Sequence, residues 1–324
     1  MIITTDILPT EVARAVKEGF AKIPKRLPSW LFYDEAGDKI FQAIMRMPEY
    51  YLTPCEYEIL QANKDKLYQR FTTDGSAFDL IELGAGDGLK TEILLRHFQS
   101  KEAAFRYLPV DVSSTALSSL THRLADIFPK LAIQPVNKQY NEAIRTLYEE
   151  DLNRKVFLFL GANIGNFQVH EAENFVTMIA SGMHPDDQLL IGFDLKKDPR
   201  LVQAAYDDPH GITRNFNMNL LIRLNRELGA QFQLDQFRHY PYYDPESGMT
   251  KSYLVSLRAQ DVYIEAFQSA IHFDRWEVIH TEVSQKYDIP MIEKIASVSG
   301  LEITDVLYDC KHYFCDVLFK KKNG

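Results

Sequence analysis

The stretch Phe78-Asp-Leu-Ile-Glu-Leu-Gly-Ala-Gly-Asp-Gly88 carries the strongest structural signal in this chain. Its first half is a largely apolar run, which is typical of a buried parallel strand. Its second half places glycine at positions 84, 86 and 88, and a helical pattern follows over 89–98. Glycines there let a ligand approach the backbone at the carboxyl end of a strand, where open α/β sheets bind ligands. We therefore expect a nucleotide-binding α/β sheet; an ordinary glycine-rich turn is the alternative.

The glycine spacing indicates which ligand to expect. It is G-x-G-x-G, and not the G-x-G-x-x-G that seats a pyrophosphate on a helix N-terminus. Glu82 lies two residues before the first glycine, a pattern common in methyltransferases that use S-adenosylmethionine. That ligand has no phosphate and carries a positive sulfonium, so a nearby acid favours it. The pattern predicts S-adenosylmethionine, with Glu82, Gly84 and Gly86 at its site.

Four further strand patterns follow, at 105–110, 132–136, 155–160 and 188–193. With helical stretches between them, they predict βαβ units and a parallel sheet. Asp111 ends the second strand pattern, where an acid commonly accepts hydrogen bonds from ribose hydroxyls. We expect the adenine near 137–140. Asn163 and Asn166 follow the later strand at 155–160, where a methyl acceptor must lie, although Gly-Asn turns are also ordinary turn chemistry.

Composition excludes several classes of protein. The chain has 324 residues, 46% of them hydrophobic, and a net charge of −9, so we expect a large core and neither nucleic acid nor an anionic membrane as partner. No apolar run is long enough to span a membrane, and the N-terminus lacks a secretion signal. Three cysteines suit a reducing cytoplasm. Cys310 and Cys315 offer too few ligands with His312 for a metal site, so we expect none.

The segments that flank the α/β core have different sequence patterns. Residues 9–62 are helical and aromatic, 198–207 and 212–228 predict helices, and 231–286 alternate as strands do. A helix over 289–299 and two strands over 303–307 and 312–319 close the sheet with an antiparallel pair. We expect one domain of 60–195 with 287–324, and a discontinuous α+β domain of 1–59 with 196–286 that caps the ligand site.

Several motifs outside the glycine loop contain candidate substrate residues. Glu282 and Ser284 point to the same face of a predicted strand, where a carboxylate and a hydroxyl would suit an imidazole or an amine. A solvated strand face would look identical. Tyrosines such as Tyr33 and Tyr50 are more often packing residues, and Tyr206, flanked by acids, is unspecific by itself.

Taken together, the motifs resemble the ergothioneine-pathway histidine N-alpha-methyltransferases. The resemblance runs from about residue 22 to the C-terminus and weakens after residue 300. It rests on the strings Leu31-Phe-Tyr33-Asp34, Pro48-Glu-Tyr50-Tyr51, Glu82-Leu-Gly84-Ala-Gly86, Phe159-Leu-Gly161, Ile164-Gly-Asn166, Asp194-Leu-Lys-Lys-Asp198, Ala205-Tyr206-Asp-Asp208, Asn225-Arg-Glu-Leu-Gly229 and Thr281-Glu282-Val-Ser284.

This resemblance implies a class I methyltransferase, with a Rossmann-like sheet, that transfers methyl groups from S-adenosylmethionine to the α-amine of L-histidine to give hercynine. It implies a small-molecule amino-acid substrate, and no obligatory protein partner is evident. The cofactor residues that it implies are Gly84, Lys90, Asp111, Gln139 and Tyr140. The substrate residues that it implies are Tyr50, Asn166, Tyr206, Ser252, Glu282 and Ser284, with Tyr33 and Asn166 nearest the reacting amine.

The chain departs from the family pattern at two places. Gln139-Tyr140 stands where an acid and an aromatic residue are usual, and an amide carbonyl can still accept from the adenine amine. Ser252 stands where a methionine is usual, at the border of the ring pocket. Ser252 therefore leaves open another amino acid or a histidine derivative as substrate. A non-catalytic domain that binds a nucleotide or a partner protein is the alternative from a different class.

Overall fold

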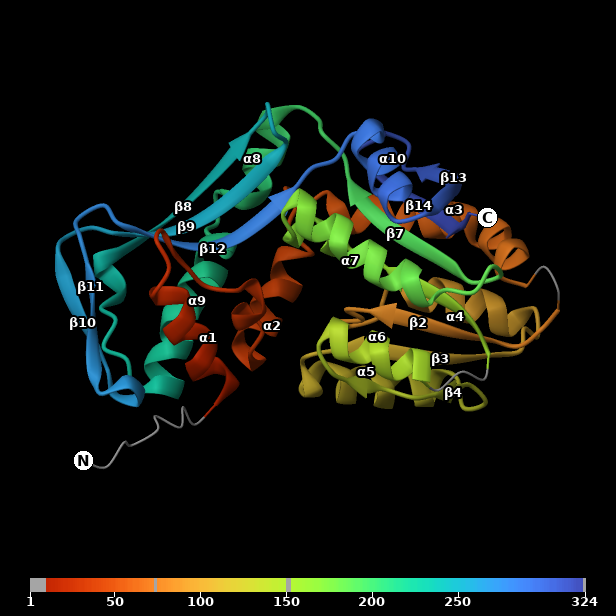
Figure 1. The fold of residues 1–324 in the computed structure, drawn as a ribbon, viewed down its shortest axis with the longest axis horizontal. Coiled ribbons are helices and arrows are strands. Elements are labelled where there is room, and N and C mark those ends of the chain that lie inside the picture. Colours follow the sequence, from red (N-terminus) through yellow and green to blue (C-terminus); the bar gives the residue numbers. More distant parts are fainter. Residues whose placement is uncertain (1–9, 73–74, 150–152, 323–324) are drawn as a thin grey trace. The chain divides into compact units, whose positions relative to one another are not determined.

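The computed structural model describes residues 10–72, 75–149 and 153–322. The chain forms two compact units, each built from separate stretches of sequence. Unit 1 comprises Met1–Tyr50 and Asp198–Ser284, and unit 2 comprises Tyr51–Lys197 and Gln285–Gly324. Figure 1 shows the elements of both units, coloured along the chain and labelled where there is room.

Unit 2 is built on an eight-stranded sheet with the order β13-β14-β7-β6-β2-β3-β4, in which β5 also pairs with β3. The pairs among β2 to β7 are parallel, whereas β14 is antiparallel to both β7 and β13. This confirms the predicted Rossmann-like sheet with its antiparallel closing pair. The strands are β2 (Phe78–Leu83), β3 (Phe105–Asp111), β4 (Ala132–Ile133), β5 (Val136–Asn137), β6 (Arg154–Phe159), β7 (Gln188–Asp194), β13 (Leu301–Tyr308) and β14 (Phe314–Lys321).

Helices pack against this sheet because its central strands are apolar on both faces; every residue of β2 is buried. One core joins the sheet to the apolar sides of α6, α7 and α10, while α3 packs on β7 and β14. Local signals place the helix starts: Ser113 caps α5, and Asp288 caps α10 ahead of a proline. The helices are α3 (Leu52–Phe71), α4 (Thr91–Ser100), α5 (Ser114–Ile127), α6 (Tyr140–Glu149), the 3₁₀ helix η2 (Asn163–Asn166), α7 (Val169–Gly182) and α10 (Ile289–Val298).

Unit 1 is an α+β unit with its own apolar core. Its main sheet has the order β1-β12-β9-β8, and β10 and β11 form a separate antiparallel hairpin. Buried and more exposed residues alternate along β8 and β9, so one face of each strand enters the core. The elements are α1 (Glu11–Phe20), β1 (Lys25–Arg26), η1 (Ser29–Phe32), α2 (Glu35–Ile44), α8 (Pro199–Tyr206), α9 (Ile212–Leu228), η3 (Leu234–Gln236), β8 (Phe237–Asp244), β9 (Met249–Ser256), β10 (Gln260–Ile264), η4 (Glu265–Phe267), β11 (Ser269–Phe273) and β12 (Val278–Gln285).

Three boundaries differ from the sequence-based expectation. The expected division after residue 59 falls inside α3, which lies wholly in unit 2 because it packs on β7 and β14. The single strand expected over 132–136 is two short strands, because Pro135 between them has no N–H to pair. Within the segment 231–286, which was expected to alternate as strands do, one strand ends at Ile264 and turns back into β11, a hairpin that the sequence pattern missed. No helix among the described residues is long and apolar enough to cross a membrane.

Candidate functional site

The glycine loop after β2 has the backbone conformation that its sequence predicts. Gly84, Gly86 and Gly88 all have positive φ angles, of 77°, 53° and 64°. Gly84 is crowded: a Cβ there would lie 2.6 Å from the Tyr140 hydroxyl and 2.8 Å from the Asn163 amide nitrogen. A Cβ on Gly86, by contrast, would meet nothing within 4 Å. The loop therefore leaves open space at Gly86, where a ligand can approach the backbone.

Asp111 holds this loop from the end of the neighbouring strand β3. Its Oδ2 accepts the Gly86 N–H at 2.9 Å, and its Oδ1 accepts the Ser113 N–H at 2.9 Å. Burial raises the pKa of Asp111, although these backbone donors favour its charged form. Each carboxylate oxygen has a second lone pair, so Asp111 can also accept hydrogen bonds from a ligand's hydroxyls.

Glu82 lies beneath the loop. It is 3% exposed, and its two oxygens accept hydrogen bonds from the Thr91 hydroxyl, at 2.5 Å, and from the Tyr107 hydroxyl. Burial raises its pKa to about 7, against the effect of these two hydroxyls. Both oxygens thus accept hydrogen bonds inside unit 2, so Glu82 is held in place next to the glycine loop.

Lys90 precedes α4 and forms an ion pair with Glu56 of α3. Burial would lower the pKa of Lys90, but the Glu56 carboxylate outweighs it and the pKa is raised. Glu56 is fully buried and also accepts the Gly161 N–H, at 2.7 and 2.9 Å. Glu56 thus joins two parts of the expected cofactor region, and sequence reasoning did not identify it.

The two residues expected near adenine differ in their surroundings. Gln139 is exposed, whereas Tyr140 is the first residue of α6. The Tyr140 ring packs on the rings of Phe159 and Phe175, with centroids 5.4 and 5.6 Å away. Burial raises the pKa of Tyr140, with Asp111 adding to the effect. Because the Tyr140 hydroxyl crowds Gly84, the structure brings this predicted residue onto the glycine loop.

A left-handed turn follows β6 and leads to Asn166. Gly161 and Ala162 have φ angles of 76° and 56°, and η2 then carries Asn163 and Asn166. Such a conformation is uncommon for a residue with a Cβ and clusters at functional sites. The Asn163 amide lies at Gly84, because the neighbouring parallel strands β2 and β6 have their carboxyl ends at the same edge of the sheet.

In unit 1, Tyr33 and Tyr50 belong to an aromatic cluster with Phe41 and Phe216. The Tyr33 ring lies edge-on to the rings of Phe41 and Phe216, with ring centroids 5.7 and 5.9 Å apart. The ring centroids of Phe41 and Tyr50 are 6.4 Å apart. Such rings suit a cation near their faces. Phe41 and Phe216 were not predicted, because only contact across unit 1 distinguishes them from other core phenylalanines.

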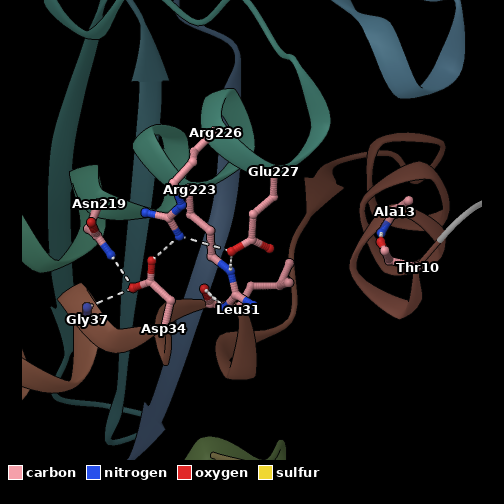
Figure 2. Close-up of polar contacts among 9 residues, drawn as sticks. All are labelled: Thr10, Ala13, Leu31, Asp34, Gly37, Asn219, Arg223, Arg226 and Glu227. Carbon is pink, nitrogen blue, oxygen red and sulfur yellow. Dashed lines mark hydrogen bonds and ion pairs between the residues drawn. The ribbon is translucent and has the colours of Figure 1, made fainter. Parts of the chain in front are cut away.

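Polar contacts from Asp34 hold the segment that carries Tyr33. Asp34 caps α2 through the Gly37 N–H at 2.7 Å and accepts from Asn219 of α9 at 2.9 Å. Figure 2 shows these bonds together with the ion pair between Asp34 and Arg226. Burial would raise the pKa of Asp34, but Arg226 and these donors lower it overall. The Tyr33 segment is therefore anchored to α9 at both of the Asp34 oxygens.

The remaining predicted substrate residues of unit 1 lie on β9, β12 and α8. Ser252 is fully buried and donates its hydroxyl to Glu282 Oε2 at 3.2 Å. Glu282 is half-buried, Ser284 is buried two residues further along β12, and Tyr206 is buried at the end of α8. The structure thus brings Ser252 and Glu282 into direct contact.

The cysteine segment near the C-terminus does not form a cysteine pair suited to a metal. Cys310 is exposed, whereas Cys315 is buried in β14. The acidic ligand atoms of Glu58 and Asp309 lie near Cys310. Asp309 accepts backbone N–H groups of its own loop, and Glu58 accepts the Cys310 N–H at 2.9 Å, so these contacts order the turn.

Known proteins resemble the chain over most of its length. The family described as histidine-specific, S-adenosylmethionine-dependent methyltransferase matches residues 12–321. Histidine N-alpha-methyltransferase of Mycobacterium tuberculosis is 34% identical over 288 residues, which cover 89% of this chain and 88% of that protein. The protein of the same name from Mycolicibacterium smegmatis is 33% identical over 302 residues, covering 93% and 92%. Ergothioneine biosynthesis protein 1 of Schizosaccharomyces pombe is 31% identical over 235 residues, 71% of this chain but 30% of that protein. The chain therefore belongs to the family of histidine-specific methyltransferases that depend on S-adenosylmethionine.

Proposed function

We propose that this protein transfers methyl groups from S-adenosylmethionine to the α-amino group of L-histidine and gives hercynine, the trimethylated amino acid. The placement of Glu282 and Ser284 two residues apart on β12 carries this proposal within the family. This carboxylate and this hydroxyl together suit an imidazole N–H. The two mycobacterial relatives are named as histidine N-alpha-methyltransferases, which supports the same choice of substrate.

The cofactor would lie at the glycine loop of unit 2. The open space at Gly86 suits close approach of S-adenosylmethionine, and Asp111 has lone pairs for its ribose hydroxyls. Lys90 would attract the cofactor's carboxylate, and Gln139 with Tyr140 would hold the adenine. Glu82 would act as a positioning residue, because it supports the loop through Thr91 and Tyr107.

The substrate would be held at both of its ends. Glu282 and Ser284 would bind the imidazole, while Asn166, Tyr206 and Tyr50 would bind the backbone groups of the amino acid. Tyr33 and Asn166 would lie nearest the amine. The aromatic cluster around Tyr33 suits the amine as it becomes a permanent cation, since ring faces attract cations.

The reaction is an in-line displacement at the methyl carbon. The lone pair of the neutral amine forms the new N–C bond, the S–C bond breaks, and its electrons remain on sulfur as S-adenosylhomocysteine leaves. Each further transfer requires the methylated amine to lose one proton first. The α-amino group of a peptide has a pKa of about 8, and the carboxylate of a free amino acid raises this pKa, so the bound amine must lose its proton before the transfer. Positioning of the neutral amine then supplies most of the rate.

A second candidate is methylation of another amino acid or of a histidine derivative, which Ser252 favours because a small polar residue alters the ring pocket. We place the enzyme in the cytoplasm, a location that its three free cysteines support, and expect a small-molecule substrate as its only required partner.

Mass spectrometry of the purified protein with S-adenosylmethionine, the twenty amino acids, histamine and the partly methylated histidines tests the proposal. We expect histidine alone to gain methyl groups, up to the trimethylated product. Methylation of another compound would favour the second candidate. Cofactor binding without any methylated product would contradict both and favour a non-catalytic domain.

A further inference from the structure

A buried group of charged side chains lies beside the proposed cofactor region. Glu56 comes from α3, Lys90 precedes α4 and Asp316 comes from β14. Glu56 and Asp316 are both 0% exposed. Two buried carboxyl groups therefore lie beside one ammonium, whose side chain is 20% exposed, in surroundings where an uncompensated charge is costly. We call Glu56, Lys90 and Asp316 the buried triad.

Glu56 accepts hydrogen bonds through both of its oxygens. It pairs with Lys90 and accepts the Gly161 N–H through both oxygens, at 2.7 and 2.9 Å. Its carboxylate lies over Gly192 of β7, where an added Cβ would collide with Oε1. The glycine at 192 therefore makes room for the carboxylate, and this packing holds Glu56 against the sheet.

Asp316 differs from Glu56 in its hydrogen bonding. It pairs with Gly192 in the β7–β14 register and so lies beside Glu56, but none of the described residues donates a hydrogen bond to either of its oxygens. Its charged neighbours are Glu56 and Lys90. Burial, and then Glu56, raise its pKa well above the ordinary value, with Lys90 opposing them. A proton on Asp316 would supply the missing hydrogen bond, directed at Glu56.

The turn that Glu56 holds is the left-handed pair Gly161 and Ala162. A Cβ at Gly161 would lie 3.0 Å from Lys90 Nζ, so turn and lysine are packed together. A non-glycine residue in this conformation persists only when its surroundings impose it. The bonds from Glu56 to Gly161 and Lys90 provide that constraint at the start of η2, which carries Asn166.

We propose that Glu56 is a positioning residue, which fixes Lys90 and the Gly161–Ala162 turn for the cofactor and is itself held by a proton that Asp316 carries. This rests on the proposed function for the identity of the ligand. With that proton in place the buried triad has no net charge, because the Lys90 ammonium balances the Glu56 carboxylate. An ionised Asp316 would instead leave two adjacent carboxylates with one cation.

Substitutions that preserve shape separate these roles. Glu56→Gln removes the charge that pairs with Lys90, whereas Asp316→Asn replaces a neutral carboxyl by a neutral amide that can still donate to Glu56. Glu58→Gln is the matched control, since Glu58 lies two residues along the same helix and is exposed. Calorimetric titration with S-adenosylmethionine should show a dissociation constant raised about 10- to 100-fold in Glu56→Gln, and changed less than about threefold in the other two variants. Thermal unfolding of each variant checks that unit 2 is folded.

A measurement on the unaltered protein tests the proton directly. NMR of the full chain with isotope-labelled aspartate should show one protonated side-chain carboxyl at neutral pH, and Asp316→Asn should remove that signal. Absence of the signal, or a loss of cofactor affinity in Asp316→Asn equal to that in Glu56→Gln, would overturn the shared proton. Cofactor affinity in Glu56→Gln equal to that of the control would overturn the positioning role. None of these readouts requires methyl transfer, so a failure to methylate histidine would count against the proposed substrate alone.

Discussion

Asp194 and Lys286 form an ion pair in which neither side chain is exposed, with Lys286 Nζ 2.7 Å from Asp194 Oδ2. The same carboxylate pairs with Lys197 and accepts the Tyr51 hydroxyl at 2.9 Å. Burial would raise the pKa of Asp194, but the two ammonium groups lower it overall. Burial lowers the pKa of Lys197 overall; the nearby Lys286 ammonium adds to this effect, whereas Asp194 opposes it. Tyr51, Lys197 and Lys286 lie at or next to the three points where the chain passes between its units, so one carboxylate anchors all three segments within unit 2.

Asp194→Asn should destabilise the protein by about 3–5 kcal/mol, because it leaves two buried ammonium groups without a carboxylate. Urea denaturation followed by circular dichroism measures this. Asp198→Asn is the control: Asp198 and Arg200 form an exposed pair, asparagine caps α8 equally well, and the change should stay within about 0.5 kcal/mol. Equal stability of the two variants would contradict the anchoring role of Asp194.

Glu82→Gln should alter how stability depends on pH. Because the pKa of Glu82 rises from 4.5 to about 7 on folding, the native state holds a proton that the unfolded state releases in this range. The stability of the unaltered protein relative to Glu82→Gln should therefore fall between pH 4.5 and 7, by on the order of 3 kcal/mol.

Glu92→Gln provides a comparison of opposite sign. Burial would raise the pKa of Glu92, but Arg123 and Arg96 lower it overall. Its contribution to stability is present above pH 4.5 and is lost as the pH falls. Urea denaturation at several pH values separates the two variants, and a parallel pH dependence in both would rule out the buried proton on Glu82.

His239 should make unit 1 sensitive to acid. Burial lowers its pKa from 6.5 to about 4, with Arg214 adding to the effect and Asp208 opposing it. The unfolded state therefore takes up a proton that the native state excludes, and stability is lost as the pH falls through this range. Relative to His239→Gln, the unaltered protein should lose on the order of 3 kcal/mol between pH 6.5 and 4.

Tryptophan fluorescence measures this loss selectively, because the chain's two tryptophans, Trp30 and Trp276, both lie in unit 1. His272→Gln is a control of opposite sign, since its ring donates hydrogen bonds to the carboxylates of Asp261 and Asp274, which raise the pKa of His272. An acid midpoint of His239→Gln equal to that of the unaltered protein would show that His239 does not contribute.

Gly86→Ala should impair cofactor binding without unfolding the protein. Gly86 and Gly300 both have positive φ angles, and an added Cβ meets nothing within 4 Å at either. Both alanine variants should therefore lose about 1–2 kcal/mol of stability from backbone strain. Only Gly86→Ala should weaken binding of S-adenosylmethionine in calorimetric titration. Equal affinities for S-adenosylmethionine in the two variants would contradict a cofactor site at this loop.

Glu282→Ala should weaken histidine binding far more than cofactor binding. Loss of a charge-assisted hydrogen bond to the imidazole corresponds to about 10- to 100-fold in the dissociation constant. Calorimetric titration with each ligand measures both affinities. Glu246→Ala, at an exposed turn of the same unit, is the control and should change neither. An equal loss of affinity for histidine and for the cofactor in Glu282→Ala would contradict the proposed contact between Glu282 and the imidazole.

Much of unit 2 could be predicted because its signals are local. Residues 78–111, a span of 34 residues, contain the apolar run of β2, the three glycines and Asp111. The residue type at each of these positions indicates what that position does. The hairpin of β10 and β11 was missed because Gln268 takes a left-handed turn that glycine or asparagine would have signalled. The division within α3 was misplaced because helix packing, and not composition, assigns that helix to unit 2.

By itself, the sequence determined the parallel sheet, the glycine loop and the residues that the family motifs mark, since strand periodicity and glycine conformation depend on neighbours along the chain. Only the tertiary structure decided which side chains support them. Glu56 meets Gly161 across 105 residues, and Ser252 meets Glu282 across 30. The hydrogen bonds that hold Glu82 have the same origin, because its burial comes from tertiary packing. No local pattern records a contact that arises only when distant strands and helices share one core.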